Sequence, residues 1–267
     1  MLHLLNIDLK KLTNYRTFWV VIIIYFSILL LVTTSGMAVL TYLAAKGAEL
    51  GADINVGRFP LYHFPDVWQN LIWVSGFLKF ALGFMVVISV TNEFAYRTVR
   101  QNIIDGMSRW EFLQSKILTN VVLAAATTVG LFIISLAAGL IMSPELRISE
   151  IFEDIEFFPA YFLQVFGYLS FALLMSVLVN RAGLTILILM VARVLELIII
   201  HNVFEKAEVV HQFFPLESLE LLITFPFKRY VFLEILDHPL ISTMLIATFW
   251  TFVFNYLAFR KLNKSDI

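Results

Sequence analysis

Residues 92–116 read NEFAYRTVRQNIIDGMSRWEFLQSK and lie between two long apolar stretches of the chain. Tyr96, Val99 and Ile103 recur at the spacing that places side chains on one face of a helix. The segment also contains the densest basic cluster of the sequence, Arg97, Arg100, Arg109 and Lys116. The pattern therefore predicts a short surface helix that is interposed between two apolar segments.

A turn and a second helix start follow within the same segment. Asp105-Gly106 is expected to end the first helix, because glycine adopts the left-handed conformation at low cost. Ser108 and Glu111 have the spacing of a capping box, in which each side chain bonds the backbone amide of the other residue. A second helix is therefore expected to begin near Arg109 and to continue into the next apolar stretch.

The composition around this segment is that of an integral membrane protein. Of the 267 residues, 60% are hydrophobic and only 15% are charged, whereas a soluble domain would carry roughly a quarter charged residues. The apolar residues occur in blocks of about 20 or more, which is enough to cross a hydrocarbon layer about 30 Å thick.

The blocks predict an all-α fold, a single transmembrane domain over 1–267 with six transmembrane helices. The expected spans are 17–43, 67–91, 117–142, 159–179, 183–203 and 237–259. Residues 1–16 carry a leucine stripe at helical spacing and are expected to form an amphipathic helix on the membrane surface, with Asp8 off that stripe. The loop 204–236 contains apolar runs that are too short to cross. They predict short outer helices before span six, lying in the outer interface.

The distribution of lysine and arginine predicts the orientation. With the N-terminus inside, eleven of the 19 basic residues fall in inner segments and six in outer loops. Basic residues accumulate on the cytoplasmic side of membrane proteins. Both termini and residues 92–116 are therefore expected to face the cytoplasm, in a bacterial cytoplasmic membrane.

Three charged residues lie inside predicted spans: Lys79, Arg193 and Glu196. Charges at this depth cost several kcal/mol and are functional candidates. Glu196 follows Arg193 by three residues and can pair with it on one helix face. Two interpretations stay open, a structural ion pair that holds the second and fifth spans together and a polar lining of a pathway or dimer seam.

The segment 92–116 resembles the corresponding segment of the permease subunits of type-2 ABC transporters. The resemblance is carried by Glu93, Arg97-Thr98, Arg100, Ile103-Ile104, Gly106, Ser108-Arg109, Phe112 and Lys116. Arg97 stands where that family often has glycine, and Asp105-Gly106-Met107 stands where it often has a proline-containing turn. Elsewhere the likeness rests on the order of spans.

The resemblance implies that 92–116 is a coupling element that docks on a separate ABC ATPase subunit, and that two permease copies, identical or related, form the pathway. The residues expected to couple are Glu93, Arg97, Thr98, Arg100, Asp105, Gly106, Ser108, Arg109, Glu111 and Lys116. The alternative for the basic cluster is contact with anionic membrane lipid.

The sequence thus favours the membrane subunit of an ATP-driven exporter of an amphiphilic or hydrophobic cargo such as a lipid, drug or peptide. The chain contains no G-x-x-x-x-G-K-[ST] loop, so ATP would be bound by the partner and no cofactor is expected here. No catalytic constellation, metal site or nucleic-acid partner is predicted. A membrane scaffold without a pathway and a stand-alone secondary transporter are the alternative functions.

Overall fold

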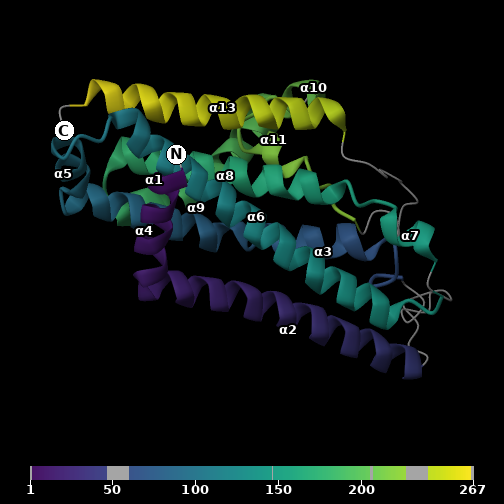
Figure 1. The fold of residues 1–267 in the computed structure, drawn as a ribbon. Coiled ribbons are helices and arrows are strands. Elements are labelled where there is room, and N and C mark those ends of the chain that lie inside the picture. The colour runs from purple at the N-terminus through teal and green to yellow at the C-terminus, as the bar shows by residue number, and fades with distance from the viewer. Residues whose placement is uncertain (1, 47–59, 146, 205–206, 227–239, 266–267) are drawn as a thin grey trace.

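The computed structural model describes residues 2–46, 60–145, 147–204, 207–226 and 240–265, and these residues form helices and connecting turns without a strand (Figure 1). The long helices are α2 (Arg16–Lys46), α6 (Arg109–Met142), α8 (Phe157–Val179), α9 (Ala182–Val203) and α13 (Ile241–Lys264). The shorter helices are α1 (Leu2–Asn14), α3 (Val67–Gly76), α4 (Lys79–Ala95), α5 (Thr98–Ile104), α7 (Ile148–Phe152), α10 (Glu208–His211) and α11 (Glu217–Glu220).

Five helices are long and apolar enough to cross a membrane, and the count becomes six if α3 and α4 together form one bent span. The all-helical prediction is therefore confirmed, with five candidate membrane-spanning helices by length and composition. The second span, expected over 67–91, consists of the two helices α3 and α4. The two halves meet at an angle of 40°.

The break between α3 and α4 is a tightened turn at Phe77 and Leu78. Both residues keep right-handed helical backbone angles. The amide of Leu78 donates to the carbonyl of Ser75 at 2.9 Å, and Ala81 donates to Leu78 at 3.1 Å. These are bonds to the third preceding residue, the 3₁₀ pattern that commonly marks a mid-helix bend. The bend places Lys79 at the first position of α4, well inside the bundle.

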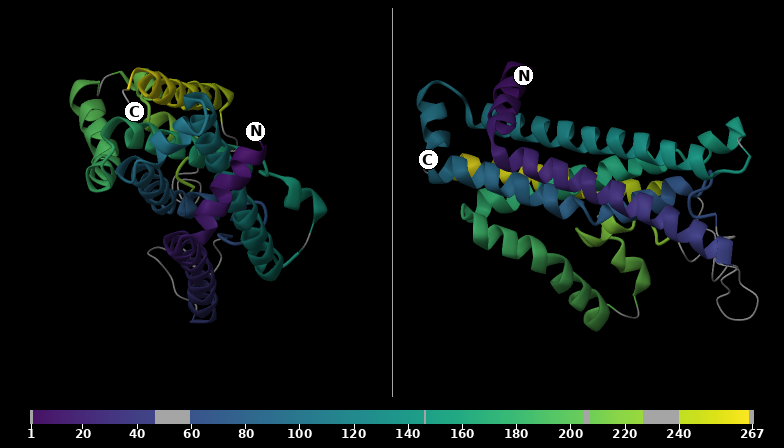
Figure 2. Two further views of the ribbon diagram at one scale, coloured as in Figure 1. Left: turned by 60° about the vertical axis from the view of Figure 1, so that its left-hand side comes forward. Right: turned by 90° about the horizontal axis from the view of Figure 1, so that it is seen from below.

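The helices run roughly side by side, and α1, α5 and the end of α13 gather at one end of the bundle, whereas α7 lies at the other (Figures 1 and 2). We call the first the terminal end, because residues near both chain termini lie there. In the right-hand view of Figure 2, α9 diverges from the other long helices towards the segment that carries α10 and α11.

Helix α8 is the centre of the bundle and packs most extensively against α13, α4 and α6. Polar side chains join the apolar helices to it, as is common between helices in lipid. Asn120 of α6 donates to the carbonyl of Leu169 at 3.2 Å, and Asn255 of α13 donates to the hydroxyl of Ser170 at 2.9 Å. The peripheral helix α2 is joined to it by a hydrogen bond between the hydroxyls of Tyr25 and Tyr161.

Two helices expected at the membrane surface pack against the bundle. Asp8, predicted to lie off the leucine stripe of the N-terminal helix, is buried, because α1 packs against α6. Helix α11, one of the short helices expected in the outer interface, contacts α8, α9 and α13, and Ser218 and Leu219 are fully or almost fully buried. Residues 205–206 and 227–239 of that loop lie outside the described residues.

Candidate functional site

The segment 92–116 has the predicted helix, turn and capped helix. Gly106 has φ of +101°, so the turn uses the conformation that glycine tolerates. The hydroxyl of Ser108 accepts the amide of Glu111 at 3.2 Å, and the Glu111 carboxylate accepts the Ser108 amide at 2.8 Å. The capping box is thus confirmed, and it fixes the first turn of α6.

The first helix differs from the prediction at its beginning. Arg97 adopts a left-handed backbone conformation with φ of 58°, which separates α4 from α5. Tyr96 consequently lies outside α5 and is 74% exposed, whereas Val99 is buried. The hydroxyl of Thr98 donates to the carbonyl of Glu93 at 3.1 Å and holds the start of α5 against the end of α4.

Lys116 connects three helices at the terminal end. Its ammonium group binds the carboxylate of Asp8 from α1 at 2.9 Å and that of Glu93 from α4. All three side chains are nearly excluded from solvent, with at most 11% exposed. Glu93 and Lys116, both predicted to belong to the coupling element, are therefore internal to the fold. Asp8 is a third member that the sequence pattern did not reveal.

Arg109 connects the start of α6 with the end of α13. Its guanidinium donates to the carbonyl oxygens of Leu262 at 3.1 Å and of Asn263 at 2.6 Å. These carbonyls belong to the last turn of a helix, which lacks internal donors and carries partial negative charge. Beside this contact, the rings of Trp110 and Phe259 meet edge to face at 5.0 Å between centroids. The capped start of α6 is therefore fastened to α13.

Arg97 and Arg100 face a cavity of about 360 Å³ at the same end. Both side chains are exposed, and no ion pair within the described residues involves either of them. The remaining walls of the cavity come from α4, α5, α8 and the end of α13: Phe94, Val99, Val177, Asn180, Leu262 and Ser265. Of the predicted basic cluster, these two arginines are the ones presented outward. Asp105 is also exposed, and it accepts a bond from Gln101 at 3.1 Å.

The three charges predicted inside spans belong to a larger group, the charge cluster, defined as Lys79, Arg193, Glu196, Glu217 and Glu220. The i, i+3 pair is present, since Arg193 binds Glu196 at 3.2 Å. The expected link from Lys79 to the fifth span is absent from the described contacts. Lys79 instead binds both carboxylate oxygens of Glu220 on α11 at 2.8 Å.

The remaining contacts of the charge cluster hold the segment around α11 in place. Arg193 also pairs with Glu217. The second oxygen of Glu196 accepts the amide of Leu216 at 2.9 Å. Sequence reasoning placed Glu217 and Glu220 in an outer loop and missed this role. The available signal was their spacing of three residues within an otherwise apolar stretch, PLESLELLI, which is unusual for a solvated loop.

A polar cavity of about 290 Å³ adjoins the charge cluster at the break between α3 and α4. Its walls combine aromatic side chains with charged and amide groups: Trp73, Gly76, Phe77, Lys79, Phe80, Gln164, Arg193, Glu220 and Ile223. The bend in the α3–α4 pair brings Gly76 and Lys79 to the same cavity. This cavity offers a small molecule both charge and aromatic surface.

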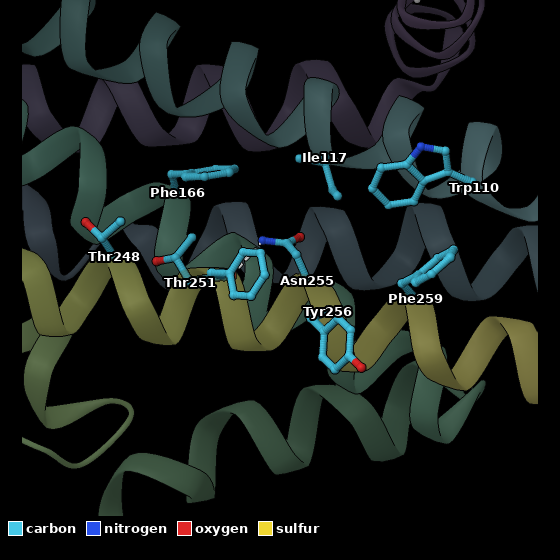
Figure 3. Close-up of a pocket in the computed structure, with 9 residues that line it drawn as sticks. Trp110, Ile117, Phe166, Thr248, Thr251, Asn255, Tyr256 and Phe259 are labelled. Carbon is cyan, nitrogen blue, oxygen red and sulfur yellow. Dashed lines mark hydrogen bonds between the residues drawn. The ribbon is translucent and has the colours of Figure 1, made fainter.

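A third cavity is almost wholly apolar and measures about 710 Å³ (Figure 3). It runs along α13 between α6 and α8, with Trp110 and Phe259 towards one end and Thr248 and Phe166 towards the other. Asn255 is the main polar group in its wall, and its amide nitrogen is engaged by Ser170. Such a surface suits hydrocarbon, and none of its lining residues carries a charge.

No model of a known protein family matches the chain. No curated protein matches its sequence either. Two polar regions of the molecule, the terminal end and the charge cluster, are therefore its candidate functional sites.

Proposed function

We propose that this chain is the membrane-spanning permease subunit of an ATP-driven exporter and that a separate ABC ATPase binds its terminal end. The observation that carries the proposal is the outward presentation of Arg97 and Arg100 on a short, capped helix–turn–helix element. Arginines without an ion pair among the described residues can form charge-assisted bonds with carboxylates of another protein. A surface that merely attracted lipid would need no such defined backbone.

The mechanical part of the proposal follows from the contacts behind that surface. A displacement of α5 would reach α6 through the short turn at Gly106 and the capping box at Ser108. The hydrogen bonds of Arg109 would transmit the displacement to α13, and the ion pairs of Lys116 would transmit it to α1 and α4. We further propose that α3 and α4 form one bent span and that both termini lie in the bacterial cytoplasm. A second permease copy completes the pathway, and the cargo is amphiphilic or hydrophobic.

The test uses an ABC ATPase encoded next to this chain, co-expressed with it. The double variant Arg97→Glu/Arg100→Glu is expected to abolish co-purification of the ATPase and stimulation of its ATP turnover. Arg147→Glu is the matched control, because Arg147 is exposed and lies before α7 at the opposite end. Full retention of both readouts in the double variant would refute docking at this surface. If the double variant keeps both ATPase readouts and loses only its binding to anionic vesicles, the arginines would be assigned to lipid contact.

One observation favours a stand-alone secondary transporter as the second candidate, namely the bent α3–α4 pair beside buried charges. Discontinuous helices near bound ions are typical of such transporters. The break here is a tight turn without an unwound stretch, so it offers few free carbonyl groups for an ion. ATP-independent uptake or release of a cargo by the purified chain in vesicles would favour this candidate over the exporter.

A further inference from the structure

The cavity at the α3–α4 break has three features that together define a ligand chemistry. The first is charge. The charge cluster beside it contains two cations and three carboxylates, with Lys79, Glu196 and Arg193 largely or wholly buried. Each cation is already bound to at least one carboxylate, and the cluster contains one more carboxylate group than it has cations. Burying a net charge is costly, and a monovalent cation would compensate it.

The second feature is an unused hydrogen-bond acceptor. Gln164 of α8 is only 2% exposed, and its amide nitrogen lies 3.4 Å from the Glu220 carboxylate. Its carbonyl oxygen Oε1 is buried and has no hydrogen-bond partner among the described residues. That oxygen is directed towards Gly76 in the cavity wall, 3.3 Å from the position a Cβ on Gly76 would occupy. Buried acceptors of this kind are normally satisfied, so the site calls for a donor.

The third feature is aromatic surface. Trp73, Phe77 and Phe80 line the cavity, and Trp73 meets Phe77 edge to face at 5.0 Å between centroids. The Lys79 ammonium already lies 5.9 Å from the centroid of the Phe80 ring. Aromatic faces attract ammonium groups most strongly where water is excluded. The walls therefore suit a second ammonium group that carries an apolar substituent.

We propose that this cavity binds a small organic ammonium ion that has at least one N–H group. The ammonium donates to Gln164 Oε1 and to the Glu220 carboxylate, and its apolar part packs against Trp73, Phe77 and Phe80. An anion is disfavoured because Lys79 and Arg193 already bind carboxylates. The proposal concerns binding by the chain itself and requires no ATPase, so it can hold or fail independently of the exporter function.

The test is a ligand comparison on the purified full-length chain in lipid nanodiscs. Benzylammonium, benzyl alcohol and benzoate share one ring and differ in the charge of the polar group. Titration calorimetry is expected to show benzylammonium binding at least about tenfold more tightly than the other two. Equal binding of benzyl alcohol would reduce the site to an apolar pocket, and preferred binding of benzoate would make it an anion site. Either result, or no binding of benzylammonium, would overturn the proposal.

Two variants locate the binding. Gln164→Leu removes the acceptor and is expected to weaken benzylammonium binding by roughly tenfold or more. Gly76→Ala adds a Cβ at 3.3 Å from that oxygen without changing charge, and it is expected to weaken binding several-fold. Gln114→Leu on α6, outside the cavity wall, is the matched control and should bind as the unchanged chain does. Unchanged binding in both cavity variants would show that the ammonium binds elsewhere.

Discussion

At the scale of single residues, Lys116 illustrates how much of the terminal end rests on one side chain. Its ammonium group is shared by two carboxylates from two other helices, and the three groups are nearly buried. A buried ion pair is weak evidence of net stabilisation, but removing one partner leaves an uncompensated charge. Lys116 leaves two such charges when it is lost.

Lys116→Met is therefore expected to lower the free energy of unfolding by about 3–5 kcal/mol, because Asp8 and Glu93 would stay buried without a cation. Denaturant unfolding in detergent micelles measures this change. Lys10→Met is the control, since Lys10 lies on the exposed side of α1, and it should change stability by no more than about 0.5 kcal/mol. Similar losses in the two variants would contradict a structural role for the Lys116 contacts.

At the scale of elements, the start of α6 depends on local bonds that can be removed one at a time. Ser108→Ala removes the side-chain acceptor of the capping box and is expected to cost about 1 kcal/mol. Ser108→Thr keeps the hydroxyl, which accepts the Glu111 amide and donates to the Glu111 carboxylate, and should retain most of the stability. Hydrogen exchange of the Glu111 amide is the measurement. If the Glu111 amide exchanges at the same rate in both variants and in the unchanged chain, packing against α13 alone fixes this turn.

The segment around α11 depends instead on distant partners. Its short helix could not persist alone, and it is held by Lys79, Arg193 and Glu196. Exposed ion pairs contribute little to stability, but only 2% of the Lys79 surface is exposed. The position of α11 is thus set by the charge cluster and by the burial of Ser218 and Leu219.

Lys79→Met is expected to accelerate hydrogen exchange in peptides covering 216–223 by about tenfold or more, because Glu220 loses its only cationic partner among the described residues. Arg147→Met breaks a pair whose side chains are mostly exposed and should leave that exchange unchanged. If the Lys79 variant exchanges at the rate of the control, apolar packing rather than the ion pair fixes α11.

At the scale of the whole molecule, the bent α3–α4 pair determines whether the chain crosses the membrane five or six times. In Figure 1 the pair extends along the bundle, with α3 towards the α7 side and α4 towards the terminal end. This arrangement favours a crossing. A crossing pair puts α1 and α5 on the same side of the membrane, whereas a re-entrant pair would put them on opposite sides.

Because the chain has no cysteine, single cysteines can report this topology directly. Asn14→Cys, Asp105→Cys and Ser149→Cys place thiols at exposed positions beside α1, α5 and α7. Labelling with a membrane-impermeant maleimide in oriented vesicles is expected to reach the first two from one side and the third from the other. Labelling of Asn14→Cys and Asp105→Cys from opposite sides would make α3 and α4 a re-entrant pair.

The local features were predictable from the sequence because they depend on neighbouring residues. Apolar length determined the long helices, the Ser108–Glu111 spacing determined the capped start of α6, and Gly106 determined the turn before it. The Arg193–Glu196 pair was likewise readable, since the two residues are three apart on one helix.

Only the tertiary structure decided which distant groups meet. Asp8 reaches Lys116 across 108 positions of the chain, and Glu220 reaches Lys79 across 141. Neither contact produces a periodic pattern in the sequence, because both depend on how the helices pack, and the Lys79 contact depends also on the bend at Phe77. The sequence by itself therefore determined that the chain folds into long apolar helices with a structured basic segment. Helix packing alone decided that the buried charges converge, because a charge removed from water is costly unless it is paired.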